Sequence, residues 1–198
     1  MKNTLAEIVS ANKKFIHNLP EEYLCHDCED PTQPADVSKY PDKHLAIYSC
    51  MDTRLVDFLE PAMGIARGEA KTIKAAGNSI ANPFGVIIRS LIVAIYELGV
   101  QEILVVGHED CGMSKSTSKG LIEKMLARGV HPSAIHLIEK ELEQWVDGFH
   151  DPVENVIQTT TKIRTNPFIP QDIPVHGLMF CPRTGEITVI INGYEHMK

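Results

Sequence analysis

The sequence of 198 residues lacks the features that mark several large classes of protein. It has no long run of lysine and arginine, and its formal net charge of −7 argues against nucleic acid as a partner. Its most apolar stretch, residues 86–98, is too short to cross a bilayer and contains Arg89 and Glu97. The first residues show neither the apolar core nor the cleavage site of a signal peptide. We therefore expect a cytoplasmic protein that does not bind a membrane.

Cysteine is scarce and odd in number, with five residues in the chain. Without an export signal, thiols in a reducing cytoplasm are expected rather than a disulfide framework. Cys25 and Cys28 form a CxxC pair in residues 25–42, a surface loop rich in proline and aspartate. The sequence has neither a second CxxC to complete a zinc knuckle nor the strand–helix context of a thioredoxin-like site. We expect these two to be exposed loop thiols without a catalytic part, and Cys181 to pack within a strand.

Apolar strand patterns alternate with helical patterns along most of the chain. This alternation predicts an α/β fold with a parallel sheet and helices on both of its faces. The last two strands are joined by the four-residue turn 182–185, so the final strand should be antiparallel. We expect one domain, 1–198, made of an N-terminal helix and loop (1–42) and a core (43–198). The expected strands are 45–49, 72–75, 102–107, 173–180 and 186–191; the expected helices are 3–18, 54–62, 83–98, 114–128, 132–146 and 153–164.

The helix expected at residues 84–98 is apolar on nearly every side. A helix on the surface of a monomer would show a polar stripe. Either this helix is sunk in its own fold, or it also covers a neighbouring subunit. For a sheet of this size we favour the second explanation, which predicts an oligomer.

Soft metal ligands follow two of the expected strands: Cys50 comes after the first, and His108 and Cys111 come after the third. Ligands of open α/β sheets collect beyond the carboxyl ends of strands, where the strand order reverses. If the first and third strands are neighbours, the three side chains converge there. Two thiolates and an imidazole suit zinc, and three protein ligands leave a fourth position open, as in catalytic sites. The alternative is that both cysteines are small buried apolar residues.

Two other metal motifs are excluded by spacing. The pair His108-Glu109 matches the start of the zinc-protease helix motif, but position 112, where a second histidine is needed, is glycine. A structural zinc site usually draws on two close ligand pairs, whereas only His108 and Cys111 form such a pair here. If these residues bind a metal, the spacing favours a catalytic site over a structural one, and the alternative of two buried apolar cysteines stays open.

Asp52 and Arg54 alternate with Cys50, so in extended backbone all three side chains point the same way. An arginine beside an aspartate holds the carboxylate ionised and in a fixed orientation. Such a carboxylate could accept a hydrogen bond from a water on the metal. The alternative is a structural salt bridge without a part in chemistry.

Three stretches together resemble the β-class carbonic anhydrases, most closely the short prokaryotic cab-type branch: SCMDTR at 49–54, AAGN at 75–78 and ELGVQEILVVGHEDCGM at 97–113. The resemblance implies zinc held by Cys50, His108 and Cys111, with a catalytic dyad of Asp52 and Arg54. It implies a sheet in the order 2-1-3-4 with the fifth strand at the edge. It also implies a homodimer that in some members pairs further into a tetramer.

The activity implied is that of a carbonate dehydratase, a zinc lyase that reversibly hydrates carbon dioxide to bicarbonate and a proton through zinc-bound hydroxide. Asp52 would accept the hydrogen bond of the hydroxide, and Arg54 would keep Asp52 charged. In some members the matching aspartate leaves the arginine and becomes the fourth zinc ligand, which closes the site. Two alternatives stay open: relatives with the same motifs hydrolyse carbon disulfide or carbonyl sulfide, and a zinc-binding regulatory protein would have lost the activity. Loss of Asp52 or Arg54 would favour the regulatory protein, and both are present.

Overall fold

The computed structural model describes residues 4–25, 28–30 and 32–197, in two compact units, one ending at Ser38 and one beginning at Lys39. The first unit contains helix α1 (Thr4–His17) and the 3-10 turn η1 (Glu21–Tyr23). The expected helix 3–18 is therefore present, while position 3 lies outside the described residues. None of the side chains of α1 is buried.

The loop after η1 is closed by a disulfide between Cys25 and Cys28, whose Cα atoms lie 5.6 Å apart. The expectation of two free thiols at these positions is therefore wrong. The Cα atoms of the two cysteines lie within the range that a disulfide needs, which their spacing in sequence does not reveal. Among the described residues, Cys50, Cys111 and Cys181 are free and buried.

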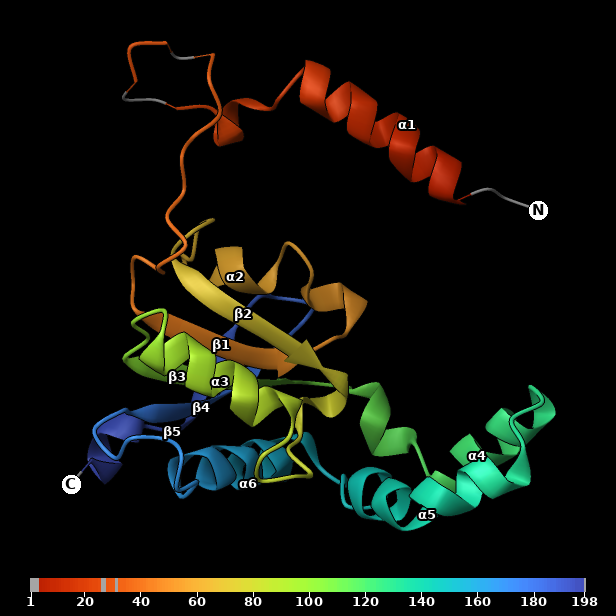
Figure 1. Ribbon diagram of the computed structural model, residues 1–198. Helices are drawn as coiled ribbons and strands as arrows, with labels where there is room; N and C mark the ends of the chain where they lie inside the picture. The colour runs from red at the N-terminus through yellow and green to blue at the C-terminus, as the bar shows by residue number, and fades with distance from the viewer. Residues whose placement is uncertain (1–3, 26–27, 31, 198) are drawn as a thin grey trace. The chain divides into compact units, whose positions relative to one another are not determined.

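The second unit is built on a five-stranded sheet in the order β2-β1-β3-β4-β5 (Figure 1). All neighbouring strands are parallel except β4 and β5, which are antiparallel. This confirms the predicted α/β fold, the 2-1-3-4 order and the antiparallel edge strand. The strands are β1 (Leu45–Cys50), β2 (Ala70–Ala75), β3 (Glu102–His108), β4 (Val175–Phe180) and β5 (Ile187–Ile191).

Helices cover both faces of this sheet. Ala46 and Tyr48 of β1 pack in one apolar cluster with residues of α3 and α6, while Leu45 and Ile47 pack in another with η2 and α2. Figure 1 shows α4 and α5 side by side at the end toward which the parallel strands point. The helices are α2 (Leu59–Ala62), α3 (Val86–Tyr96), α4 (Ser118–Ala127), α5 (Pro132–Val146) and α6 (Pro152–Arg164); the 3-10 turns are η2 (Thr53–Leu55), η3 (Ala76–Asn78), η4 (Gly112–Lys115) and η5 (Gly193–His196).

Helix α6 lies unusually close to the sheet because β4 carries a glycine beneath it. A Cβ atom on Gly177 would lie 2.9 Å from Val156 Cγ1 and 3.0 Å from Thr160 Oγ1. Any side chain there would push the helix outward. The close approach lets the first half of α6 reach η3, the turn that follows β2.

Three expected helices differ in the structure. The helix expected at 114–128 begins only at Ser118, after the separate 3-10 turn η4. The helix expected at 54–62 is split into η2 and the short α2, because Asp57 takes a left-handed backbone conformation with φ of 53°. Helix α3 begins at Val86 rather than Pro83, and its chain leaves the helix through Gly99, whose φ is 72°. Within the described chain, no helix is both long and apolar enough to cross a membrane.

Candidate metal centre

The parallel pairing of β1 with β3 brings the three soft ligands together. Ser49 pairs with Val106, so Cys50 at the end of β1 lies next to the end of β3, where His108 stands. Cys111 follows three residues later at the start of η4. The sulfur atoms of Cys50 and Cys111 are 3.9 Å apart, and the ligand atoms of all three residues lie within 4.8 Å of one another. All three side chains are buried.

The geometry of this Cys-His-Cys cluster fits a tetrahedral metal ion. Zinc bonded to two thiolates at about 2.3 Å each would place the sulfurs roughly 3.8 Å apart. His108 Nδ1 lies 2.9 Å from the carbonyl oxygen of Glu109, to which it donates its proton. The lone pair is therefore on Nε2, which is buried and has no hydrogen-bond partner within the described chain. A metal ion would satisfy this atom.

The charges within the cluster also suit a cation. The S–H of Cys111 donates toward Cys50, which lowers the pKa of Cys50 and raises that of Cys111. Burial lowers the pKa of His108, but the neighbouring Cys50 thiolate and Asp52 raise it by a larger amount, so the net shift is upward. Negative charge therefore gathers around the histidine, as a site that binds a divalent cation requires.

Asp52 is held beside the cluster by Arg54. Arg54 Nε donates to Asp52 Oδ1 at 2.9 Å and Nη2 donates to Oδ2 at 2.8 Å, a two-point contact that the backbone N–H of Arg54 reinforces. These bonds lower the pKa of Asp52 to about 2. Asp52 Oδ2 lies 3.8 Å from His108 Nε2, so the ionised carboxylate borders the position that a metal would occupy.

The two residues of this dyad meet for a different reason from the one that we expected. Extended backbone ends near Asp52, which caps η2, and Arg54 lies within that 3-10 turn. The side chain of Arg54 therefore turns back onto Asp52 rather than projecting in step with it along a strand. The expected proximity of Asp52 and Arg54 is found, but the extended alternation proposed for Arg54 is wrong.

Asp110 is a further residue of the site that sequence reasoning did not identify. Its carbonyl oxygen accepts a hydrogen bond of 2.9 Å from Arg54 Nη2, and its Oδ2 lies 3.5 Å from Arg54 Nη1. Lys115 binds the other carboxylate oxygen of Asp110 at 2.6 Å. The feature of the sequence that could have identified Asp110 is its position between the candidate ligands His108 and Cys111. Asp110 gives Arg54 a second anchor, on the loop that carries Cys111.

The turn at residues 75–78 forms one wall of the cluster. Gly77 has φ of 65°, and a Cβ atom there would lie 2.9 Å from Met113 Cγ and 3.0 Å from the ring of Phe149. Both conditions require glycine. The backbone N–H of Gly77 donates toward Cys50 and lowers the pKa of its thiol.

Known proteins are similar to this chain in sequence and in fold. The family described as carbonic anhydrase matches residues 45–187. The Bacillus subtilis protein YtiB is 45% identical over 195 residues, which cover 97% of this chain and 98% of that protein. The crystal structure of β-carbonic anhydrase isoform I (TvaCA1) from Trichomonas vaginalis matches with a TM-score of 0.88 and 45% identity, covering 98% of this chain and 100% of that one.

A more distant relative carries a different name. The carbon disulfide hydrolase of an Acidianus strain is 26% identical over 153 residues, which cover 70% of this chain and 72% of that protein. The family match spans the four parallel strands β1 to β4 and the whole Cys-His-Cys cluster, and the match to the Trichomonas structure extends over nearly the full chain. On these grounds the chain belongs to the carbonic anhydrase family, in its β class.

Proposed function

We propose that Cys50, His108 and Cys111 hold a zinc ion and that this site performs the reversible hydration of carbon dioxide to bicarbonate and a proton. The observation that supports the ligand set is the buried, unpartnered Nε2 of His108 facing two sulfurs, with an ionised carboxylate at its edge. When bound, zinc acidifies a coordinated water and supplies the nucleophile for carbon dioxide, an effect established for carbonic anhydrases with three histidine ligands. The enzyme is thus a carbonate dehydratase, a lyase.

The chain's own residues would orient the reaction. Asp52 stays ionised across the physiological range because Arg54 binds both of its oxygens. An ionised carboxylate is an acceptor without a proton to give, so it can take one hydrogen bond and fix the direction of the atom that donates it. Arg54 keeps that acceptor in place, and the Asp110 carbonyl keeps Arg54 in place. The fourth zinc position would be open with Asp52 on Arg54, and closed if Asp52 became a ligand.

Stopped-flow hydration of carbon dioxide by zinc-loaded protein tests the activity. We expect turnover far above the uncatalysed reaction and about one zinc per chain. Carbon disulfide and carbonyl sulfide, tested in parallel, distinguish a hydrolase such as the Acidianus relative. Zinc binding without turnover of any of the three substrates would instead support a regulatory protein, which the intact Asp52–Arg54 pair argues against.

We also propose that the enzyme is a homodimer of the cytoplasm. Helix α1 buries none of its side chains, and α3 leaves Val86 and Val93 65% and 50% exposed, more apolar surface than a helix usually presents to water. Sedimentation at micromolar concentration should show no species at the chain mass of 22.0 kDa. A species of twice that mass indicates the dimer, one of four times indicates a tetramer, and a stable active monomer would contradict the proposal.

A further inference from the structure

Residues 77–80, which include the end of η3 and the first part of the loop to α3, are an irregular segment whose backbone is held by side chains. Each of the four carbonyl oxygens accepts a hydrogen bond from a side chain, at 2.8 Å for Gly77, Ser79 and Ile80 and 3.2 Å for Asn78. Buried backbone groups outside helices and strands need such partners. The four donors are Asn155 Nδ2 to Gly77, Thr159 Oγ1 to Asn78, Tyr48 OH to Ser79 and Lys162 Nζ to Ile80.

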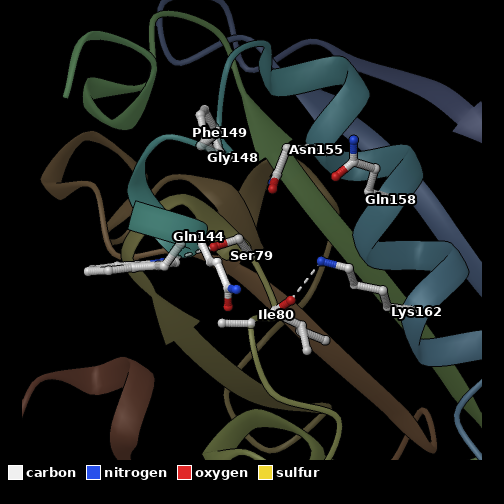
Figure 2. A pocket seen from close by; sticks show the side chains of 10 residues that line it. Ser79, Ile80, Gln144, Gly148, Phe149, Asn155, Gln158 and Lys162 are labelled. Atoms are coloured by element: carbon white, nitrogen blue, oxygen red, sulfur yellow. Dashed lines mark hydrogen bonds between the residues drawn. The ribbon is translucent and has the colours of Figure 1, made fainter. Parts of the chain in front are cut away.

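Three of these donors come from one face of α6. Residues 155, 159 and 162 are spaced by four and then three positions, which places them in a row along a helix. Figure 2 shows Asn155 and Lys162 projecting from α6, with Lys162 reaching the carbonyl of Ile80 across a cavity of about 210 Å³. Asn155 and Thr159 are buried. We name Asn155, Thr159 and Lys162 the α6 clasp.

One member of the clasp, Asn155, binds the residue that faces the metal cluster. The pairing of Cys50 with Ala75, and the 3.2 Å hydrogen bond from the N–H of Met51 to the carbonyl oxygen of Ala75, place the start of η3 against the end of β1, where the N–H of Gly77 faces the Cys50 thiol. The carbonyl oxygen of Gly77 is held by Asn155. As a glycine with φ of 65°, Gly77 has more conformational freedom than any other residue type would have there. A hydrogen bond on its far side is therefore needed to keep the N–H aimed at the sulfur. Asn155 Nδ2 also donates to Asn78 Oδ1 at 3.4 Å, which holds the side chain of the residue after Gly77.

We propose that Asn155 is a positioning residue for the metal ligand Cys50, acting through the backbone of Gly77. The inference rests on the proposed zinc site. Partners that orient a metal ligand from outside the coordination sphere commonly change metal affinity by 10- to 100-fold when they are removed. Asn155 is 105 positions from Cys50 in sequence and touches neither the metal ligands nor the Asp52–Arg54 pair, so its effect should appear in zinc binding before it appears anywhere else.

The test is Asn155→Asp, which keeps the shape of the side chain but replaces the donor to Gly77 by an acceptor. Zinc affinity of the full chain is measured by competition with a chromophoric chelator. We expect the dissociation constant for zinc to rise about 10- to 100-fold. In cobalt-loaded protein, the sulfur-to-cobalt absorption should shift or weaken. Lys162→Met is the matched control, since it removes a donor to the same segment three residues further along; its zinc affinity and cobalt spectrum should equal those of the parent.

Several outcomes would overturn the inference. A folded Asn155→Asp protein with parental zinc affinity and cobalt spectrum would show that Gly77 needs no such support. Equal losses of affinity in Asn155→Asp and Lys162→Met would show a general loosening of the segment instead of a specific action on Cys50. If Asn155→Asp does not fold, the isosteric Thr159→Val releases the neighbouring carbonyl, and it should weaken zinc binding several-fold; parental affinity there overturns the inference. A parent that binds no zinc would overturn the proposed function together with this inference, whereas failure of the variants alone leaves the proposed function intact.

Discussion

Two buried histidines lie at opposite ends of the sheet, each beside a carboxylate, and only one is placed to bind a metal. His108 stands at the carboxyl end of β3, where Asp52 Oδ2 lies 3.8 Å from its Nε2. His176 stands near the start of β4, where Glu102 Oε1 lies 3.0 Å from its Nε2. The two rings differ in what their Nδ1 atoms do. Nδ1 of His108 donates to the Glu109 carbonyl, whereas Nδ1 of His176 accepts from the N–H of Gly193.

This difference assigns the protons of the two rings in opposite ways. His108 carries its proton on Nδ1, which leaves the lone pair of Nε2 facing two sulfurs. His176 carries its proton on Nε2, which lies 3.0 Å from Glu102 Oε1, and the other oxygen of Glu102 accepts from the hydroxyl of Tyr194 at 3.0 Å. The Nε2 of His176 therefore has no lone pair to offer a metal ion. A single backbone contact on the far nitrogen decides whether a buried histidine binds a metal or stabilises the fold.

The pKa values follow the same division. Burial lowers the pKa of His176, and Glu102 opposes this only in part, so the net shift is downward. The net shift of His108 is upward, because the Cys50 thiolate and Asp52 outweigh its burial. Two negative groups, Cys50 and Asp52, raise the pKa of His108, whereas Glu102 is the group that raises the pKa of His176, so the surroundings of His108 are the more favourable for a cation.

The largest expected effect comes from breaking the metal-binding end. Cys111→Ser replaces a thiolate by a hydroxyl that binds zinc poorly, so most of the zinc and at least about 100-fold of the hydration rate should be lost. Metal analysis and stopped-flow kinetics measure both. His176→Asn is the matched control and should retain about one zinc per chain. Full zinc retention in Cys111→Ser would refute the ligand assignment.

A smaller loss of activity is expected from Asp52→Asn. The amide cannot hold a charge-assisted contact with Arg54, so we expect the hydration rate to fall about 100-fold while zinc is retained. The pKa of Asp52 is already lowered to about 2, so its protonation cannot change activity between about pH 6 and 9. Two thiolates would neutralise the charge of zinc, so a water bound to zinc should be a weak acid. The hydration rate should therefore rise with pH across that range. A flat profile with a fully active Asp52→Asn would contradict both statements.

At the other end of the sheet, His176→Asn should change stability rather than activity. The shorter side chain loses the contact with Glu102, so we expect unfolding free energy to fall by about 1–2 kcal/mol with hydration unchanged. The native pKa of His176 lies below its unfolded value near 6.5, so the stability that it contributes is present above that pH and is lost as pH falls through the native pKa. Denaturant unfolding of both proteins should show their difference narrowing from pH 7.5 to 5. A difference that widens on acidification would mean that His176 is charged in the native state.

The smallest effect is expected from the third group of possible ligands, Cys25 and Cys28. Their side chains bond to each other in a unit separate from the sheet. Changing both to serine should leave zinc content and hydration rate within about twofold of the parent values, as for surface changes away from the site. A tenfold fall in rate would show that this loop takes part in the chemistry.

The sequence predicted the ends of the elements well where local signals set them. Helix α5 occupies the expected residues 132–146, because Pro132 suits the first turn and His131 caps it. The prediction of one helix at 54–62 was wrong, because Asp57 takes a left-handed backbone conformation that its residue type only weakly favours. The candidate ligands Cys50, His108 and Cys111 could be recognised from the sequence because Cys50 and His108 end strands and Cys111 follows three residues later, a signal that lies within a few residues of sequence.

Interactions between distant residues could not be predicted in this way. Asn155 and Gly77 are 78 positions apart in sequence, and the hydrogen bond between them depends on how closely α6 approaches β4. Arg54 meets Asp110 across 56 positions, through a turn whose direction the sequence does not specify. The proton positions of His108 and His176 likewise depend on backbone groups that only the folded chain brings to their rings.

The parallel pairing of β1 with β3 also determines the order in which the protein matures. Cys50 and Cys111 are separated by 61 positions, and β2 and α3 must be placed between them before the two sulfurs can meet. In zinc fingers the ligand pairs are close in sequence, and the metal itself drives folding. At the site proposed here the sheet would have to form first, and zinc would be captured last. The supply of zinc in the cell would therefore set the fraction of folded chains that are active, while synthesis and folding proceed independently of it.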